Sequence, residues 1–190
     1  MKLKNITTGY IPDAMDNKLI FLFILDKMEI PLTETSIIDI CTNQNDWLNY
    51  MDCKDIMWQL QNVKLIYKTV DDENESRYNI TAAGRECLAH FFGRLPISLR
   101  EEISNFAKQN RMQLKRNQEY VGKYQKNKDG SVLTSLKIKD PLENRNLFEI
   151  KIILPNTKQA ILACKNWKEK APQIYENIFD IISEEEHVEK

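Results

Sequence analysis

The chain has 190 residues and a formal net charge of -1, with 42% apolar and 29% charged residues. These values are ordinary for a globular protein and give no sign of a general polyanion binder. The 5 glycines and 6 prolines are too few for a collagen-like or proline-rich architecture.

The longest apolar run, from Leu19 to Leu25, is far shorter than the roughly 20 residues that a membrane span needs. No apolar stretch directly follows the charged N-terminus, so no secretory signal is expected. We therefore expect a cytoplasmic protein without membrane contact.

The first apolar segment predicts a central helix from Asp16, as its cap, to about Met28, because it is apolar on nearly all sides. Thr33 or Thr35 is a suitable cap for a second helix with an apolar side around Ile37 to Cys41. The run Asn43 to Asp46 indicates a turn, and Trp47-Leu48 is interpreted as a short strand.

A third helix is predicted from Asn49 to Asn62, since Cys53, Ile56, Met57 and Leu60 form a helical stripe. Two strands follow, Leu65 to Val70 and Ser76 to Ile80, around an acidic turn. Thr81 then caps a helix that ends near Phe92, and Gly84 within that helix indicates close packing.

This order of elements is that of a winged helix-turn-helix. The segments Leu60 to Tyr67 and Tyr78 to Gly84 are similar to winged-helix regulators of the PadR and MarR type. The chain from about 15 to 182 resembles a small bacterial family, labelled a domain of unknown function and described as winged-helix regulators. The resemblance implies a winged helix over 12–95 and a transcriptional regulator that binds double-stranded DNA, usually as a homodimer.

The second half, 96–183, changes its periodicity. The capping box at Ser98 to Glu101 predicts a helix that reaches about Leu114. Three segments of alternating polarity then predict a three-stranded antiparallel meander with one apolar face, and two C-terminal helices follow, the second with Pro172 in its first turn. The fold class is therefore α+β, with an acidic, frayed tail at 184–190.

The winged-helix interpretation selects polar residues for DNA contact on three parts of the first half. They lie at the start of the second helix, on and before the third helix, and beside the wing. The candidates are Thr33, Thr35, Ser36, Asn45, Asn49, Lys54, Gln61, Lys64, Lys68 and Arg77.

Charge argues against part of this interpretation. Residues 1–95 carry 10 basic and 14 acidic side chains, and four of the acids lie in the wing turn at 71–75. Phosphate contact depends on basic neutralisation, and Asp52 and Asp55 are unusual on a reading helix. A winged-helix module for protein interaction or scaffolding, without DNA binding, therefore stays open as the alternative.

A second basic patch follows in the sequence, formed by Lys108, Arg111, Lys115 and Arg116. It is a candidate nucleic-acid surface, with a solvated helix face as the competing interpretation. The C-terminal helix has more apolar coverage than one face needs, and it predicts dimer contacts through Ile174, Ile178 and Ile181.

Catalysis has little support in the sequence. No glycine-rich phosphate loop is present, and the four cysteines and two histidines lack the spacing of a metal site. We expect neither an enzyme nor a cofactor or metal. A small-molecule effector of unknown identity is a possible ligand of the second half.

Overall fold

The structure, a computed structural model, describes residues 10–70, 74–140 and 145–183. Its contacts group the chain into two compact units, of which the first extends to Met112 and the second begins at Gln113. Both contain helices and an antiparallel sheet, so the predicted α+β class is confirmed. Within the described ranges, no helix has the length and apolar character that a membrane crossing requires. The acidic residues 71–73 and the acidic tail lie outside the described residues.

Helix α1 (Ala14–Met28) forms the centre of the first unit. Every side chain from Leu19 to Leu25 is buried, as its all-round apolar character predicted. The predicted cap was wrong by three residues: Asp13 is the N-cap, and Asp16 completes a capping box with it. Asp16 belongs to the first turn, where its carboxylate bonds the Asp13 backbone N–H.

Strand β1 (Leu32–Thr33) leads into α2 (Glu34–Asp39), which Thr33 caps as predicted. The first two residues of the expected turn at 43–46 belong to a π-helix, Ile40–Gln44, whereas Asn45 is a turn residue. Trp47-Leu48 forms no strand. Helix α3 (Tyr50–Asn62) begins after its cap Asn49 and buries the predicted stripe.

Strands β2 (Ile66–Val70) and β3 (Ser76–Ile80) form a hairpin, and β1 completes the sheet in the order β1-β3-β2. Helix α4 (Ala82–Phe91) follows from its predicted cap Thr81. A short 3-10 helix, Phe92–Arg94, connects α4 to α5 (Ile97–Glu119), which continues beyond the predicted end at Leu114.

The second unit contains the predicted meander: β4 (Tyr120–Lys126), β5 (Val132–Asp140) and β6 (Arg145–Leu154), paired in that order. Alternate β5 residues such as Val132, Thr134 and Leu136 are buried, because one face of the sheet is covered by a helix. A register irregularity between Ile138 and Lys139 marks a bulge near the start of β6.

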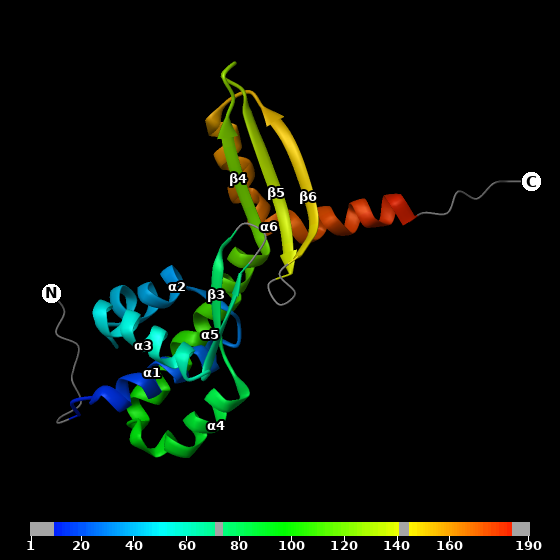
Figure 1. Ribbon diagram of the computed structural model, residues 1–190. Coiled ribbons are helices and arrows are strands. Elements are labelled where there is room, and N and C mark those ends of the chain that lie inside the picture. The colour runs from blue at the N-terminus through cyan, green and yellow to red at the C-terminus, as the bar shows by residue number, and fades with distance from the viewer. Residues whose placement is uncertain (1–9, 71–73, 141–144, 184–190) are drawn as a thin grey trace, which may run out of the picture. The chain divides into compact units, whose positions relative to one another are not determined.

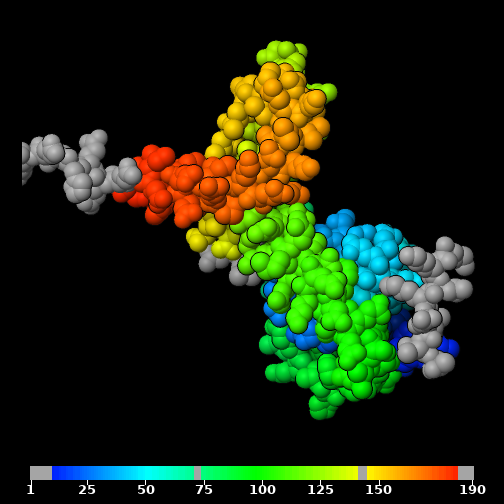
Figure 2. Space-filling view, turned by 180° about the vertical axis from the view of Figure 1, so that it is seen from behind, coloured from blue at the N-terminus to red at the C-terminus, as the bar shows by residue number. Residues whose placement is uncertain are grey.

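That covering helix is α6 (Thr157–Ser183), a single helix with Pro172 inside it. The two predicted C-terminal helices were therefore wrong, although α6 changes direction along its length (Figure 1), as an interior proline causes. Seen from behind in Figure 2, α6 lies in front of the strands. Its Trp167 is buried and donates an indole hydrogen bond to the Lys137 carbonyl at 2.9 Å.

Candidate nucleic-acid interface

Helix α3 presents one broad exposed side. Opposite its buried stripe, Met51 and Trp58 are exposed by 73% and 66%, and Lys54 lies between them. These three positions follow the helical repeat of three to four residues, so they share one face. Gln61 continues that face one turn further and is also exposed. The outward face of α3 is therefore mixed, with two large apolar side chains and a single cation.

Lys54 is held by an acid of the neighbouring helix. Its ammonium forms an ion pair with the Glu34 carboxylate in the first turn of α2. The hydrogen bond to Glu34 raises the pKa of Lys54 above its ordinary value. The positive charge on α3 is thus largely neutralised by α2 in the unliganded chain.

The hydroxyl groups of the candidates before and within α2 lie together. The Thr33 hydroxyl accepts from the Ser36 backbone N–H at 3.2 Å and donates to the Ser36 hydroxyl oxygen at 2.8 Å. The Thr35 hydroxyl lies 3.0 Å from that of Thr33. Thr33 caps the helix, and Thr35 is the exposed member of the three.

Asn45 and Asn49 have local structural roles. The Asn45 amide donates to the Ile40 carbonyl at 2.9 Å, which closes the π-helix. Asn49 accepts from the Asp52 backbone N–H and donates to the Asp52 carboxylate at 2.7 Å. The carboxylate of Asp52 therefore serves the start of α3, and it also accepts from Asn17 of α1.

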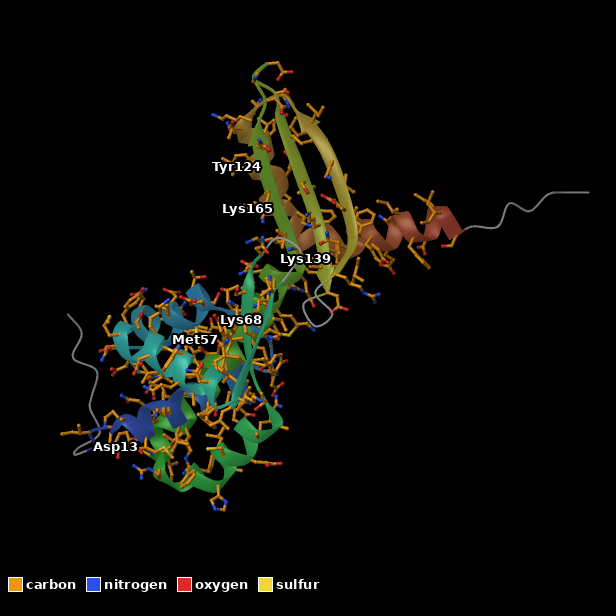
Figure 3. All side chains as sticks on the ribbon, viewed as in Figure 1. Asp13, Met57, Lys68, Tyr124, Lys139 and Lys165 are labelled. Atoms are coloured by element: carbon orange, nitrogen blue, oxygen red, sulfur yellow. The ribbon has the colours of Figure 1, made fainter. Side chains whose placement is uncertain are left out.

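The candidate cations on and before β2 and β3 do not converge. Lys68 on β2 lies opposite Tyr78, whereas Arg77 lies opposite Thr69 on the other face of the sheet. Arg77 is also buried, with an ion pair to Glu75 at 2.6 Å. Lys64 is exposed in a left-handed conformation, and its carbonyl accepts from the Thr81 hydroxyl. Of the two strand cations, Lys68 is the one on the accessible surface (Figure 3).

Each of the two exposed cations on α3 and β2 has its own partner. The Lys68 ammonium lies 5.9 Å from the centre of the Tyr78 ring. Lys54 is instead paired with Glu34 of α2. Sequence reasoning missed Tyr78 and Glu34, because their roles depend on strand register and on the packing of α2 against α3.

A pocket of about 380 Å³ lies behind the C-terminal half of α3. Its walls are mainly apolar and come from α1, α3, the residues between α3 and β2, and α4. The lining residues include Met15, Lys18, Leu19, Trp58, Val63 and Cys87. The pocket therefore shares Trp58 with the exposed face of α3.

The basic residues of α5 are divided between the two units. In the first unit, Lys108 is exposed, and Arg111 forms an ion pair with Glu29. In the second unit, Lys115 lies 3.6 Å from the Glu119 carboxylate, and Arg116 is exposed. Two of these four cations thus have acidic partners.

The predicted dimer residues of α6 differ in their surroundings. Ile174 packs against the core formed by Leu136, Ile138, Trp167 and Ala171. Ile178 is half-buried, and Ile181 is exposed by 70%. Exposed apolar side chains therefore occur both near the start of α6, at Ile161 and Leu162, and after Ile174.

Among the residues that the structure describes, no group of three His, Cys, Asp or Glu side chains is arranged to hold a metal ion. Cys41 and Cys53 are buried together between the π-helix and α3. Their hydrogen bond, together with burial, raises the pKa of the Cys41 thiol well above its ordinary value. This thiol is therefore protonated and suited to packing rather than to nucleophilic chemistry.

The sequence profile of a protein family described as "Domain of unknown function (DUF4364)" matches residues 17–182. The chain belongs to this family. No curated protein and no solved structure matches the chain.

Proposed function

We propose that this chain is a cytoplasmic DNA-binding transcriptional regulator that uses a winged helix-turn-helix and acts as a homodimer. The order α1, β1, α2, α3, β2, β3, α4 supports this reading, because a helix pair followed by a hairpin is the arrangement of winged helices. In this proposal α3 enters the major groove, and the β2–β3 hairpin is the wing.

The observation that carries the proposal is this order of elements, with Lys54 exposed on α3 and Lys68 exposed on β2. In the proposal, the reading helix and the wing would each offer a cation to the phosphates of DNA. Thr35 adds an exposed hydroxyl at the start of α2, in the same unit. Gln61 and Lys64 are further along the exposed end of α3 and serve as candidate contacts to bases or phosphates.

The proposal is tested by binding of the purified full chain to fragmented genomic DNA at about 50 mM and about 150 mM salt. We expect selective retention of some fragments, and its loss in Lys54→Glu but not in Lys115→Glu/Arg116→Glu. Loss in the second variant alone would move the nucleic-acid surface to the second unit. No retention at the lower salt would overturn DNA binding by the unliganded chain.

Met51 and Trp58 favour a second candidate, a winged-helix module that binds a protein partner. Both are large, apolar and mostly exposed on the face that would otherwise read DNA. Exposed aromatic and methionine side chains are enriched in the centres of protein interfaces. This candidate does not bind DNA, so absence of DNA retention by the unmodified chain at about 50 mM salt would favour it.

A small-molecule effector also belongs to the proposal. The sequence placed it in the second half, whereas the pocket between α1, α3 and α4 lies in the first unit. A ligand there would contact Trp58 and the end of α3. It would therefore act on the proposed reading helix directly.

A further inference from the structure

Strand β6 (Arg145–Leu154) is an open edge of the second sheet. Within the described residues it pairs with β5 on one side, and its other side has no strand. Three of its apolar side chains are exposed: Leu147 by 49%, Ile152 by 39% and Ile153 by 67%. A long edge strand with exposed apolar residues is a template for pairing with another chain.

The opposite edge, β4, is better protected. Helix α6 packs closely on it, so that a Cβ atom at Gly122 would lie 2.8 Å from the Cys164 Cβ. Lys123 and Lys126 add charge to that strand, as is common for edges that avoid pairing. By contrast, α6 contacts β6 at few positions, so β6 is the edge with room for a partner.

We propose that two copies of this chain pair through β6, antiparallel and centred on Ile150, to form one continuous sheet. This deepens the homodimer part of the proposed function and names its contact. The occupant of the open edge is therefore a second copy of the chain.

Symmetry limits the possible registers. Residues that face each other in an antiparallel pair point to the same face of the sheet, whereas neighbours along one strand point to opposite faces. A two-fold axis perpendicular to a continuous sheet must therefore pass between two copies of the same residue. With Ile150 on the axis, Glu149 lies opposite Lys151 of the second copy, and Lys151 opposite its Glu149. With Glu149 or Lys151 on the axis, two like charges would face each other directly, which is destabilising.

The same register also matches the apolar residues. Ile153 of the second copy reaches the level of Leu147, the bulged residue. On the helix-covered face, Phe148 lies opposite the second copy's Ile152. The bulge falls at Leu147, beyond the regular ladder from Phe148 onward. The segment 148–152 is therefore regular and symmetric about Ile150.

The end of α6 supplies a second contact. In Figure 1 its C-terminal half runs past the β6 edge of the sheet. A row of aromatic rings follows it, from Phe148 to Tyr175 at 5.6 Å and on to Phe179 at 6.5 Å. Tyr175 and Phe179 are exposed by 40% and 55%. The strand of a second copy would lie beneath this overhanging apolar surface and cover it.

A cysteine on the axis tests the register directly. Facing residues in an antiparallel pair have Cα atoms about 4.5 to 5.5 Å apart, which suits a disulfide. We expect Ile150→Cys to form a covalent dimer on mild oxidation with diamide. Ile152→Cys is the matched control, because it is more exposed but lies about 13 Å from its own copy in this register. The unmodified chain controls for its native cysteines.

Charge reversal provides an independent test in solution. Glu149→Lys and Lys151→Glu each place two like-charged pairs across the axis, and we expect each to raise the dimer dissociation constant about tenfold or more. The double variant Glu149→Lys/Lys151→Glu restores both pairs, so its dissociation constant should return close to that of the unmodified chain. Sedimentation velocity measures all four proteins without DNA.

Three results would overturn the proposal: a monomer at about 100 µM, crosslinking of Ile152→Cys in preference to Ile150→Cys, or no rescue in the double variant. Circular dichroism of each variant verifies that the fold is kept. The dimer is measured without DNA, so the two proposals are tested separately. If the chain forms this dimer but binds no DNA, only the proposed regulator function is refuted. A monomer that binds DNA would refute only the strand pairing.

Discussion

Lys54, the single cation of α3, forms an ion pair with Glu34 in the first turn of α2. In the proposed winged helix, the pair would join the two helices that contact DNA. It is exposed, so its effect on stability is small. Its main consequence is electrostatic, because a phosphate must compete with Glu34 for the Lys54 ammonium.

We expect Glu34→Gln to strengthen DNA binding. The substitution removes the acid and leaves Lys54 available to a phosphate, so affinity at low salt should rise about three- to tenfold. The slope of log affinity against log salt should become steeper by about the amount that one additional phosphate contact contributes. Fluorescence anisotropy with a retained fragment, measured across a salt series, tests both effects.

The control for this variant is Asp39→Asn, which removes an acid from the end of the same helix. Asp39 accepts from Asn43 and Gln44 and does not bond Lys54. An equal gain in affinity for both variants would show a general charge effect and contradict a specific role of the Lys54–Glu34 pair.

A second prediction concerns the stability of the first unit. A Cβ atom at Gly84 would lie 2.2 Å from the Leu65 carbonyl oxygen and 2.7 Å from Ile80 Cγ1. Gly84→Ala must therefore move α4 away from the sheet, and we expect it to lower the free energy of unfolding by about 2 kcal/mol or more. This loss exceeds the gain of about 1 kcal/mol from the helix propensity of alanine.

Gly93→Ala is the matched control, since a Cβ atom there meets nothing within 4 Å. Its effect on the free energy of unfolding should be within about 1 kcal/mol, and stabilising if anything. Urea denaturation followed by circular dichroism compares the two variants. Similar losses in both would show that the contact of Gly84 is not the cause.

Much of the fold was predictable because it is encoded by local spacing. The stripe of Cys53, Ile56, Met57 and Leu60 repeats at the helical period, and it is the buried side of α3. The caps Thr33 and Thr81 were recognised because their hydroxyl groups precede apolar runs. The α+β class follows from the change to period two after α5.

The misplaced elements depend on contacts between distant segments. Pro172 predicted a helix start, because an interior proline costs a backbone hydrogen bond. Helix α6 nevertheless continues through it, since Ala171 and Ile174 on either side pack against the sheet core. Long-range packing therefore outweighs the local preference of one residue.

The candidate interface was less predictable than the fold. Lys54 was correctly placed on the exposed side of α3, but its partner Glu34 is distant in sequence. Lys68 and Arg77 were both expected to flank the hairpin, and the strand register puts them on opposite faces. A set of polar residues with plausible spacing does not determine which of them converge, because convergence is set by tertiary packing.

A third prediction follows from Asp13, the cap of α1. The backbone N–H of Asp16, aided by Arg94, lowers the pKa of the Asp13 carboxyl below its ordinary value. A lowered pKa in the folded state stabilises the fold fully above the unfolded pKa, about 3.9. We therefore expect stability to fall as the pH decreases below about 4, through the lowered folded pKa.

Asp13→Asn should reduce this dependence, because asparagine keeps a capping oxygen but has no carboxyl to protonate. Urea midpoints measured between about pH 3 and pH 7 should therefore vary less in this variant than in the unmodified chain. Glu101→Gln removes a carboxyl from an exposed position of the same unit. A reduction of the pH dependence in this control as large as in Asp13→Asn would contradict the assignment to the cap.

The last prediction concerns the pocket beside Trp58. Its apolar walls and the ammonium of Lys18 suit a small apolar ligand with an anionic group. The dye 8-anilinonaphthalene-1-sulfonate has this character, and we expect it to bind the native chain and to change the fluorescence of Trp58. Lys18→Ala should weaken binding several-fold, because it removes the charge at the pocket, and Trp58→Ala should weaken it by removing a wall.

Lys27→Ala is the control, since Lys27 lies on the same helix and pairs with Asp26 outside the pocket. Equal affinities in the Lys18 and Lys27 variants would mean that the dye binds elsewhere. Because α3 forms one wall, a ligand that fills the pocket should also shift the affinity for DNA, and the shift should be absent in Trp58→Ala.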